Sequence, residues 1–180
     1  MWNLVSLDGF FEASRGDLSF HQYAGGPDLE SFVTEQCKSV GGLLFGRITY
    51  EGMAAFWRSQ HGEVADFMNA VPKVVFSKSL EKAEWNNSRL VTSNAELEVT
   101  RLKREVGQDL FIFGSGQLTS TLTTHGLIDE YRIGLVPVLL GRGTPLFRSD
   151  PSPIKLKLLE ARPMDTGCLL LRYAPDPSAK

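Results

Sequence analysis

Residues 111–118 of this 180-residue chain, which read FIFGSGQL, are the stretch most informative about its fold. Three apolar residues run directly into two glycines one residue apart, and a polar segment able to form a helix follows. The pattern predicts a buried strand, a tight turn and a helix start. Such a turn suits phosphate, because glycine lets the backbone approach the oxygens and free amides at a helix N-terminus favour negative charge. Taken alone, the stretch is explained equally well as an ordinary strand-to-helix turn.

Two glycine motifs of defined chemistry do not match this stretch. A dinucleotide fingerprint of the form GxGxxG needs a third glycine where the chain has Thr119, and it normally follows the first strand of the domain. A nucleophile elbow of the form GxSxG needs a serine where the chain has Gly116.

Two further strand ends carry residues suited to phosphate, LLFGRITYE at 43–51 and VVFSKS at 74–79. The carboxyl ends of parallel strands share one edge of a sheet, where open α/β sheets bind ligands. Taken singly, the charged side chains could be surface groups and the hydroxyls could be caps. Together, the three strand ends predict a site for a pyrophosphate and one further phosphate, as in NADPH. The residues added by the two segments are Gly46, Arg47, Thr49, Ser77 and Lys78.

Short apolar stretches alternate with amphipathic segments along most of the chain. The expected strands are 2–6, 42–45, 71–76, 89–92, 110–113 and 131–136, followed by a hairpin of 154–161 with 168–173. The expected helices begin at Asp28 and near Thr49, and cover 95–106 and 115–125. This order predicts a single three-layer α/β domain over residues 1–174, with a mostly parallel mixed sheet, a C-terminal antiparallel hairpin and a flexible tail at 175–180.

Composition narrows the class of partner and the compartment. The formal net charge is −2 and the pI is about 5.9, so we expect no nucleic-acid binding. No apolar run reaches the length of a membrane span and no secretory signal is seen, so we expect a cytoplasmic protein. Cys37 and Cys168 are too few for a disulfide framework, and the three histidines lack ligand spacing, so we expect no metal site.

The ordered set of motifs resembles the dihydrofolate reductase-like family. The resemblance is strongest to the branch that contains the reductase domain of the bifunctional riboflavin-biosynthesis deaminase–reductase, and it covers nearly the whole chain. The matching segments are VSLDGF at 5–10, GRITYE at 46–51, VFSK at 75–78, FGSG at 113–116, LIDE at 127–130 and PVLLGRGTPLF at 137–147.

The resemblance implies an NADPH-dependent reductase, usually a homodimer, that delivers hydride to a small cyclic substrate such as a pterin or a pyrimidine. Trp2 and Leu4 stand where riboflavin-pathway reductases have lysine and alanine, so the substrate stays open. The implied cofactor residues are Gly9, Gly46, Arg47, Thr49, Ser77, Lys78, Gly114, Ser115, Gly116, Gln117 and Leu118.

Asp8 is the acidic residue that we expect nearest the hydride acceptor, with a simple turn residue as the alternative. The expected substrate contacts are Phe10, Asp28, Phe32, Tyr50 and Trp57. The aromatic members could instead belong to the core, and Asp28 could cap its helix. A second function class is a nucleotide-binding protein on the same scaffold without turnover. A thiol or serine hydrolase is the least favoured of the three function classes, because the sequence gives no signal that pairs a nucleophile with a base.

Overall fold

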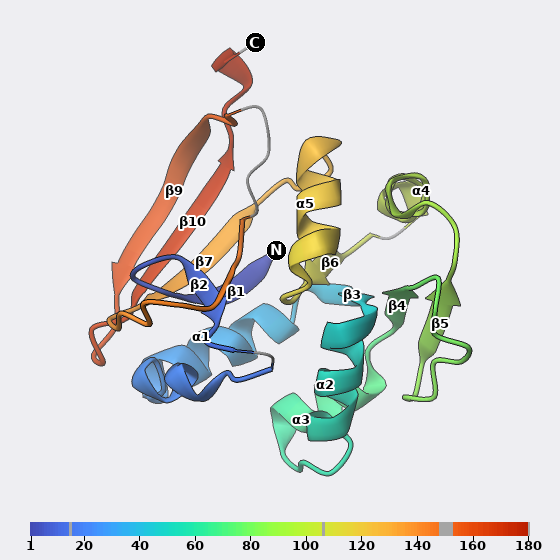
Figure 1. The fold of residues 1–180 in the computed structure, drawn as a ribbon, viewed down its shortest axis with the longest axis horizontal. Helices are drawn as coiled ribbons and strands as arrows, with labels where there is room; N and C mark the ends of the chain where they lie inside the picture. Colours follow the sequence, from blue (N-terminus) through green and yellow to red (C-terminus); the bar gives the residue numbers. More distant parts are fainter. Residues whose placement is uncertain (15, 106, 148–152, 180) are drawn as a thin grey trace. The chain divides into compact units, whose positions relative to one another are not determined.

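The computed structural model describes residues 1–14, 16–105, 107–147 and 153–179 (Figure 1). The chain divides into two compact units, one of Met1–Glu30 with Ile128–Lys180 and one of Ser31–Leu127. Helix α1 (Pro27–Cys37) crosses the boundary between them. The expectation that residues 1–174 form a single domain stays a prediction.

The unit Ser31–Leu127 is built on a four-stranded parallel sheet in the order β5–β4–β3–β6. The strands are β3 (Val40–Gly46), β4 (Lys73–Phe76), β5 (Ser88–Val91) and β6 (Asp109–Ile112). Leu44 of β3 lies opposite Val74 on one side and Ile112 on the other. The continuous apolar run of β3 is explained by this central position, since Leu43, Leu44 and Phe45 are all buried.

Helices α2 (Arg47–Trp57) and α3 (Glu63–Ala70) join β3 to β4, and α4 (Ala95–Glu105) joins β5 to β6 (Figure 1). Helix α5 (Gly116–Thr124) follows β6. The helix predicted over 95–106 is confirmed as α4, with Val99 and Leu102 buried, whereas Val106 lies outside the described residues. The sequence analysis missed α3, and α2 begins two residues before the expected start near Thr49.

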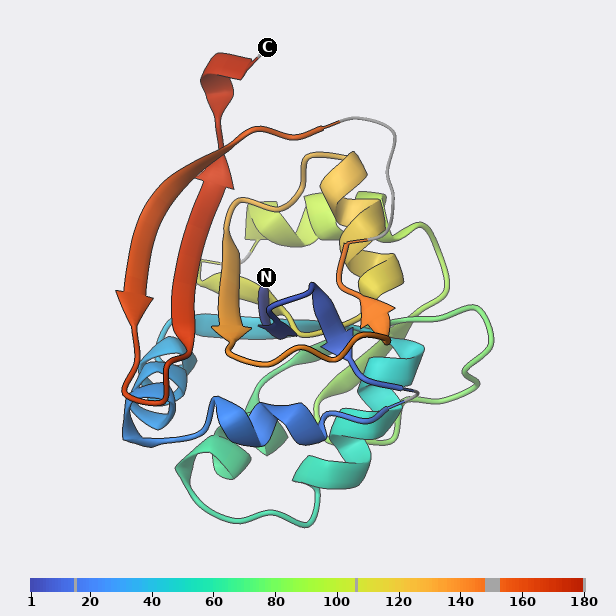
Figure 2. The same ribbon diagram turned by 60° about the vertical axis from the view of Figure 1, so that its left-hand side comes forward.

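The other unit contains a four-stranded sheet in the order β1–β7–β10–β9. Strand β1 (Trp2–Ser6) runs parallel to β7 (Tyr131–Val136), and β10 (Leu169–Pro175) runs antiparallel to both β7 and β9 (Leu156–Pro163). Figure 2 shows the long β9–β10 hairpin beside β7. A short antiparallel pair, β2 (Phe10–Glu12) with β8 (Thr144–Pro145), and the 3₁₀ helix η1 (Ser19–Tyr23) belong to the same unit.

The predicted fold class is confirmed. The chain is a mixed α/β protein whose strand pairs are mostly parallel, and the C-terminal antiparallel hairpin is present. The expected tail is partly structured: Pro175 ends β10, the amide of Asp176 donates to the carbonyl of Lys155 (2.9 Å), and η2 covers Pro177–Ala179. Lys180 lies outside the described residues. None of the helices within the described ranges combines the length and apolar character that a membrane crossing requires.

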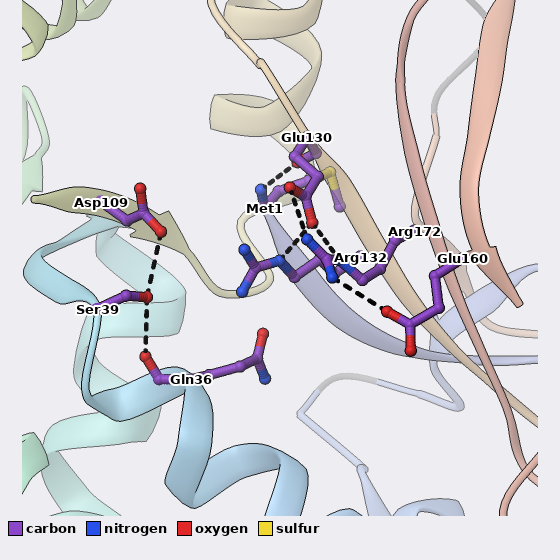
Figure 3. Close-up of polar contacts among 8 residues, drawn as sticks. All are labelled: Met1, Gln36, Ser39, Asp109, Glu130, Arg132, Glu160 and Arg172. Carbon is purple, nitrogen blue, oxygen red and sulfur yellow. Dashed lines mark hydrogen bonds and ion pairs between the residues drawn. The ribbon is translucent and has the colours of Figure 1, made fainter. Parts of the chain in front are cut away.

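A cluster of ionic side chains joins Glu130, the residue before β7, to side chains of β7, β9 and β10 (Figure 3). Glu130 accepts hydrogen bonds from Nε of Arg132 (2.6 Å) and Nε of Arg172 (2.7 Å), and Arg172 also binds Glu160 (3.0 Å). The N-terminal ammonium donates to the main-chain carbonyl of Glu130 (2.6 Å), so the carboxylate and the carbonyl of one residue both anchor the start of the sheet.

In the unit Ser31–Leu127, Figure 3 shows a smaller polar contact. Oγ of Ser39 lies within hydrogen-bond distance of the Gln36 carbonyl (3.2 Å) and of Oδ2 of Asp109 (3.1 Å). The second contact ties the turn after α1 to the start of β6, next to the paired residues Val40 and Asp109.

Candidate active site

The candidate site lies where the strand order of the parallel sheet reverses. From β3 the chain passes to β4 on one side, and after β5 it returns to place β6 on the other side of β3. In open α/β sheets, ligands bind beyond the carboxyl ends of the strands at such a switch point. Gly46 ends β3 and begins α2, and Ser115 joins β6 to α5, so both expected phosphate turns meet there. The ends of β3, β4 and β6 do share one edge, as expected.

Three hydrogen bonds tie the two turns together. The amide of Gly46 donates to Oγ of Ser115 (2.8 Å). The amide of Ser115 donates to Oγ1 of Thr49 (3.0 Å), and the Ser115 hydroxyl donates to the same oxygen (2.8 Å). The backbone bend is held further by the hydroxyl of Thr119, which donates to the carbonyl of Gly114 (3.1 Å). The site is therefore a braced pair of turns.

Both helices that begin at these turns lack a side-chain cap. Gly46 has no side chain, and Ser115 precedes α5 in the left-handed conformation (φ 56°, ψ 58°) with no side-chain bond to its own helix. A serine in this place would ordinarily accept a hydrogen bond from an amide of the first turn. The amides at 47–49 and 116–118 precede the first intrahelical acceptors, and no other acceptor for them is found within the described part of the chain. Two helix N-termini with free amides make a favourable environment for an anion.

The side chains near these amides differ in exposure. Gln117 is exposed, whereas Leu118 is buried, so Leu118 can offer a ligand its amide but its side chain belongs to the core. Gly114 is also left-handed (φ 54°), a conformation that costs glycine little. Glycine at 114 therefore favours the backbone geometry of the turn.

The end of β4 lies beside the end of β3, since Phe76 pairs with Gly46. Oγ of Ser77 accepts hydrogen bonds from the amides of Ser79 (3.1 Å) and Leu80 (2.9 Å), so Ser77 shapes its own turn. Lys78 is exposed and forms no ion pair with the residues that the structure describes. A cation is thus available close to the switch point.

Arg47 supplies a second cation. Its Nη1 contacts Oε2 of Glu51 (2.9 Å), and both side chains are about half exposed. The sequence analysis gave Glu51 no role. The spacing of four residues between Arg47 and Glu51 on a helix was a signal for this ion pair. A surface ion pair of this kind is weak, so Arg47 can turn to a phosphate at small cost.

Asp8 is exposed and accepts three hydrogen bonds. They come from the Ser6 hydroxyl (2.7 Å), the amide of Leu140 (3.2 Å) and the amide of Gly141 (2.7 Å). The bond from Ser6 is the main cause of a pKa below the ordinary value of the carboxyl group, and the two amides add to it. A general acid at neutral pH needs a raised pKa. The geometry therefore favours an anchoring role for Asp8, between the loop after β1 and the loop after β7, over proton donation.

Gly9 and Phe10 follow in the same turn. Gly9 has a positive φ of 89° and its amide donates to the carbonyl of Ser6 (2.9 Å). The amide of Phe10 donates to Oγ of Ser6 (3.0 Å), and Phe10 begins β2 with a partly exposed side chain. Contacts of Gly9 with a cofactor and of Phe10 with a substrate stay predictions.

The remaining expected substrate contacts occupy different environments. Tyr50 is 4% exposed, and its hydroxyl accepts the amide hydrogen of Trp85 (2.8 Å). It therefore lies in the core, which was the alternative to a substrate contact. Phe32 is half-buried, and Trp57 is half-buried against Phe56, with a ring separation of 4.9 Å. Their substrate contacts stay predictions.

Asp28 does not cap its helix. Helix α1 begins at Pro27, so Asp28 lies inside the first turn, and the expectation of a cap at this residue is wrong. Proline is common at the first helical position because its missing amide has no partner there in any case. Oδ2 of Asp28 instead accepts the amide hydrogen of Asp165 (3.1 Å), which gives the carboxylate a local structural partner.

A buried lysine was missed by the sequence analysis because it lies within the mostly apolar stretch 71–76, at the first residue of β4. Lys73 is 1% exposed, and its Nζ donates to the carbonyls of Val71 (2.8 Å), Asn86 (3.0 Å) and Asn69 (3.4 Å). Burial lowers the pKa of Lys73 to about 8. The ammonium also lies 4.4 Å from the ring centre of Trp85, so this lysine holds the core together. Among the residues that the structure describes, no three His, Cys, Asp or Glu side chains gather as a metal ion would require.

Comparison with known proteins agrees with this architecture. The uncharacterized protein YyaP of Bacillus subtilis (strain 168) is 28% identical over 174 residues, which span 94% of this chain and 90% of YyaP. A solved structure from Shewanella sp. PV-4, named for riboflavin biosynthesis, superposes with a TM-score of 0.81 at 22% identity and 97% coverage of both chains. The dihydrofolate reductase of Enterococcus faecalis, solved with NADP(H), has a TM-score of 0.66 at 14% identity, with 97% of this chain and 94% of that chain covered.

These structural similarities establish the fold, which is that of dihydrofolate reductase-like and RibD-like reductases. The family follows from the sequence itself, because the model of the RibD C-terminal domain matches residues 1–170. The chain therefore belongs to the RibD C-terminal domain family.

Proposed function

We propose that the protein is an NADPH-dependent reductase that transfers hydride to a small cyclic substrate of the pterin or pyrimidine type. The observation that carries the proposal is the pair of uncapped helix N-termini at the switch point, braced by Ser115 and Thr49. Each terminus offers free amides and the positive end of a helix dipole. A pyrophosphate has two linked anionic groups, which matches two adjacent termini.

Arg47 and Lys78 extend this anion site. They stand at the carboxyl ends of the neighbouring strands β3 and β4, both reachable from solvent. A cation pair beside a pyrophosphate site suits the additional 2′-phosphate that distinguishes NADPH from NADH. The Enterococcus dihydrofolate reductase, which shares the fold and was solved with NADP(H), supports the same cofactor.

The cofactor would supply the hydride when bound, and the chain would bind and orient it. The amides of α5 and α2 would hold the pyrophosphate, and Arg47 with Lys78 would hold the 2′-phosphate. Asp8, with its lowered pKa, would anchor its loop as a carboxylate, so the proton that accompanies hydride transfer would have another source.

A comparison of two dinucleotides tests the proposal. The purified protein is titrated with NADPH and with NADH, and the shift of its melting temperature and its dissociation constants are measured. We expect NADPH to bind more tightly, and R47A/K78A to lose most of that preference while NADH affinity changes little. K38A/K82A removes the same charge from exposed, ion-paired lysines of the same unit and should keep the preference. Equal loss for both dinucleotides in R47A/K78A would contradict the role of these cations.

Turnover is tested separately with a panel of pterins, pyrimidines and quinones, through the loss of the absorbance of reduced nicotinamide. Oxidation of NADPH with one of these acceptors supports a reductase. Tight binding of NADPH without oxidation by any acceptor would instead support the nucleotide-binding protein without turnover.

A further inference from the structure

We propose that Ser115 is a positioning residue, which orients the hydroxyl group of Thr49 so that its hydrogen is presented to a phosphate of the bound dinucleotide. The proposal rests on the function proposed above and assigns a task to a side chain that does not itself need to touch the ligand. It follows from the direction of three hydrogen bonds, from an unfavourable backbone conformation and from the packing of Gly46.

The direction of two of the three hydrogen bonds is fixed by their amide donors, and burial decides the third. The amide of Gly46 can only donate, so Oγ of Ser115 accepts there. The amide of Ser115 can only donate, so Oγ1 of Thr49 accepts there. The Ser115 hydroxyl hydrogen then goes to Oγ1 of Thr49, at 2.8 Å.

The opposite orientation of that last bond would leave the hydrogen of Ser115 without an acceptor. Ser115 is 9% exposed, so a free donor there would be costly, whereas Thr49 is half-exposed. With the favourable orientation, Oγ1 of Thr49 accepts twice and its own hydrogen is directed elsewhere. Among the described residues, no protein group accepts that hydrogen. A phosphate oxygen over the two helix N-termini would be such an acceptor.

The backbone at Ser115 supports the same conclusion. Ser115 and Asn87 are the non-glycine residues with positive φ in the described part of the chain, and both have φ 56°. Glycine would adopt this conformation more readily, and glycines already stand on both sides at 114 and 116. A left-handed serine therefore carries a strain that its side chain must offset, and residues of this kind gather at ligand sites.

Gly46 is constrained by the same hydroxyl group. A Cβ atom built on Gly46 would lie 3.2 Å from Oγ of Ser115 and 3.5 Å from its Cβ. The need for a small residue at 46 thus arises in part from Ser115, and not only from the approach of a phosphate. The three residues form one braced unit.

The test uses S115A, S115G, T49V and the double variant S115A/T49V in the full chain. Dissociation constants are measured for NADPH and for adenosine 2′-monophosphate, which carries the 2′-phosphate but no pyrophosphate, and melting temperatures are measured without ligand. We expect S115A and S115G each to weaken NADPH about tenfold or more, because a hydrogen bond to a charged group is lost or misdirected. Adenosine 2′-monophosphate should bind all variants about equally.

The double variant separates positioning from general damage. Once Thr49 lacks its hydroxyl, removal of the Ser115 hydroxyl should have no further effect, so S115A/T49V should bind NADPH as T49V does. S115G relieves the strained backbone, so it should melt no lower than S115A and keeps the test usable if S115A is poorly folded. The role of Ser115 would be overturned if S115A bound NADPH as the wild type does. It would also be overturned if the loss of NADPH affinity in S115A/T49V equalled the product of the two single losses. Failure of the wild-type protein to bind NADPH would instead overturn the proposed function.

Discussion

The ionic cluster on β7, β9 and β10 gives a stability prediction whose size can be worked from the structure. Burial opposes ionisation of Glu130, but hydrogen bonds from Arg172 and Arg132 outweigh it and lower the pKa from 4.5 to about 2. Each pKa unit corresponds to about 1.36 kcal/mol, so the difference of about 2.5 would give at most about 3.4 kcal/mol. Partial solvation screens the pair, and we expect E130Q to lower the free energy of unfolding by about 1–2 kcal/mol at pH 7.

The pH dependence of this loss has a definite sign. The folded protein holds Glu130 ionised at a pH where the unfolded chain takes up a proton, so the contribution is complete well above pH 4.5 and is lost as the pH falls toward about 2. Urea unfolding of the wild type and E130Q at pH 7 and near the acid limit of folding measures the difference. The gap between the two proteins should narrow on acidification.

The matched control is E35Q. Glu35 pairs with Lys38 at 2.7 Å, but the two side chains are 72% and 66% exposed, so the change should cost no more than about 0.5 kcal/mol. Glutamine keeps the shape of Glu130 and leaves its main-chain bond with the N-terminus in place (Figure 3). An effect of E130Q equal to that of E35Q, or one that is constant with pH, would refute the reasoning.

Three further changes test other parts of the structure. D8N should lower the melting temperature through its loop but keep turnover with NADPH, whereas loss of a general acid would cost about a hundredfold or more in rate. G46A should weaken NADPH binding because its Cβ crowds Oγ of Ser115, while G52A, with open space around its Cβ in α2, should raise stability by about 0.5–1 kcal/mol and leave binding unchanged. G134A should destabilise the protein by about 1–3 kcal/mol, measured by urea unfolding, because its Cβ would press on Leu4 and the Trp2 ring; a neutral effect would show that β1 can move away.

Much of the fold could be predicted from local sequence. Strands β1 and β7 were placed at their observed bounds, because a short, mostly apolar stretch is a signal that can be read locally. The strand-to-helix turns at 46 and 114–116 were also predicted, since glycine and the periodicity that follows it are local signals. Helix α3 was missed because it is short and its inward face reduces to two buried residues, Ala65 and Met68.

The sequence by itself determined which residues could meet an anion, because glycine, hydroxyl and cationic residues follow three separate apolar strands. Only the tertiary structure decided how they are used. Whether Ser115 caps its own helix or braces Gly46 and Thr49 depends on its left-handed backbone and on the neighbouring strand. Whether Tyr50 faces a ligand or the core, and whether Asp8 is an acid or an anchor, depends on partners 35 and 133 residues away in the chain. Spacing along a sequence fixes which groups are near in the chain, but hydrogen-bond partners and burial, which set the chemistry of each group, are fixed by packing between distant segments.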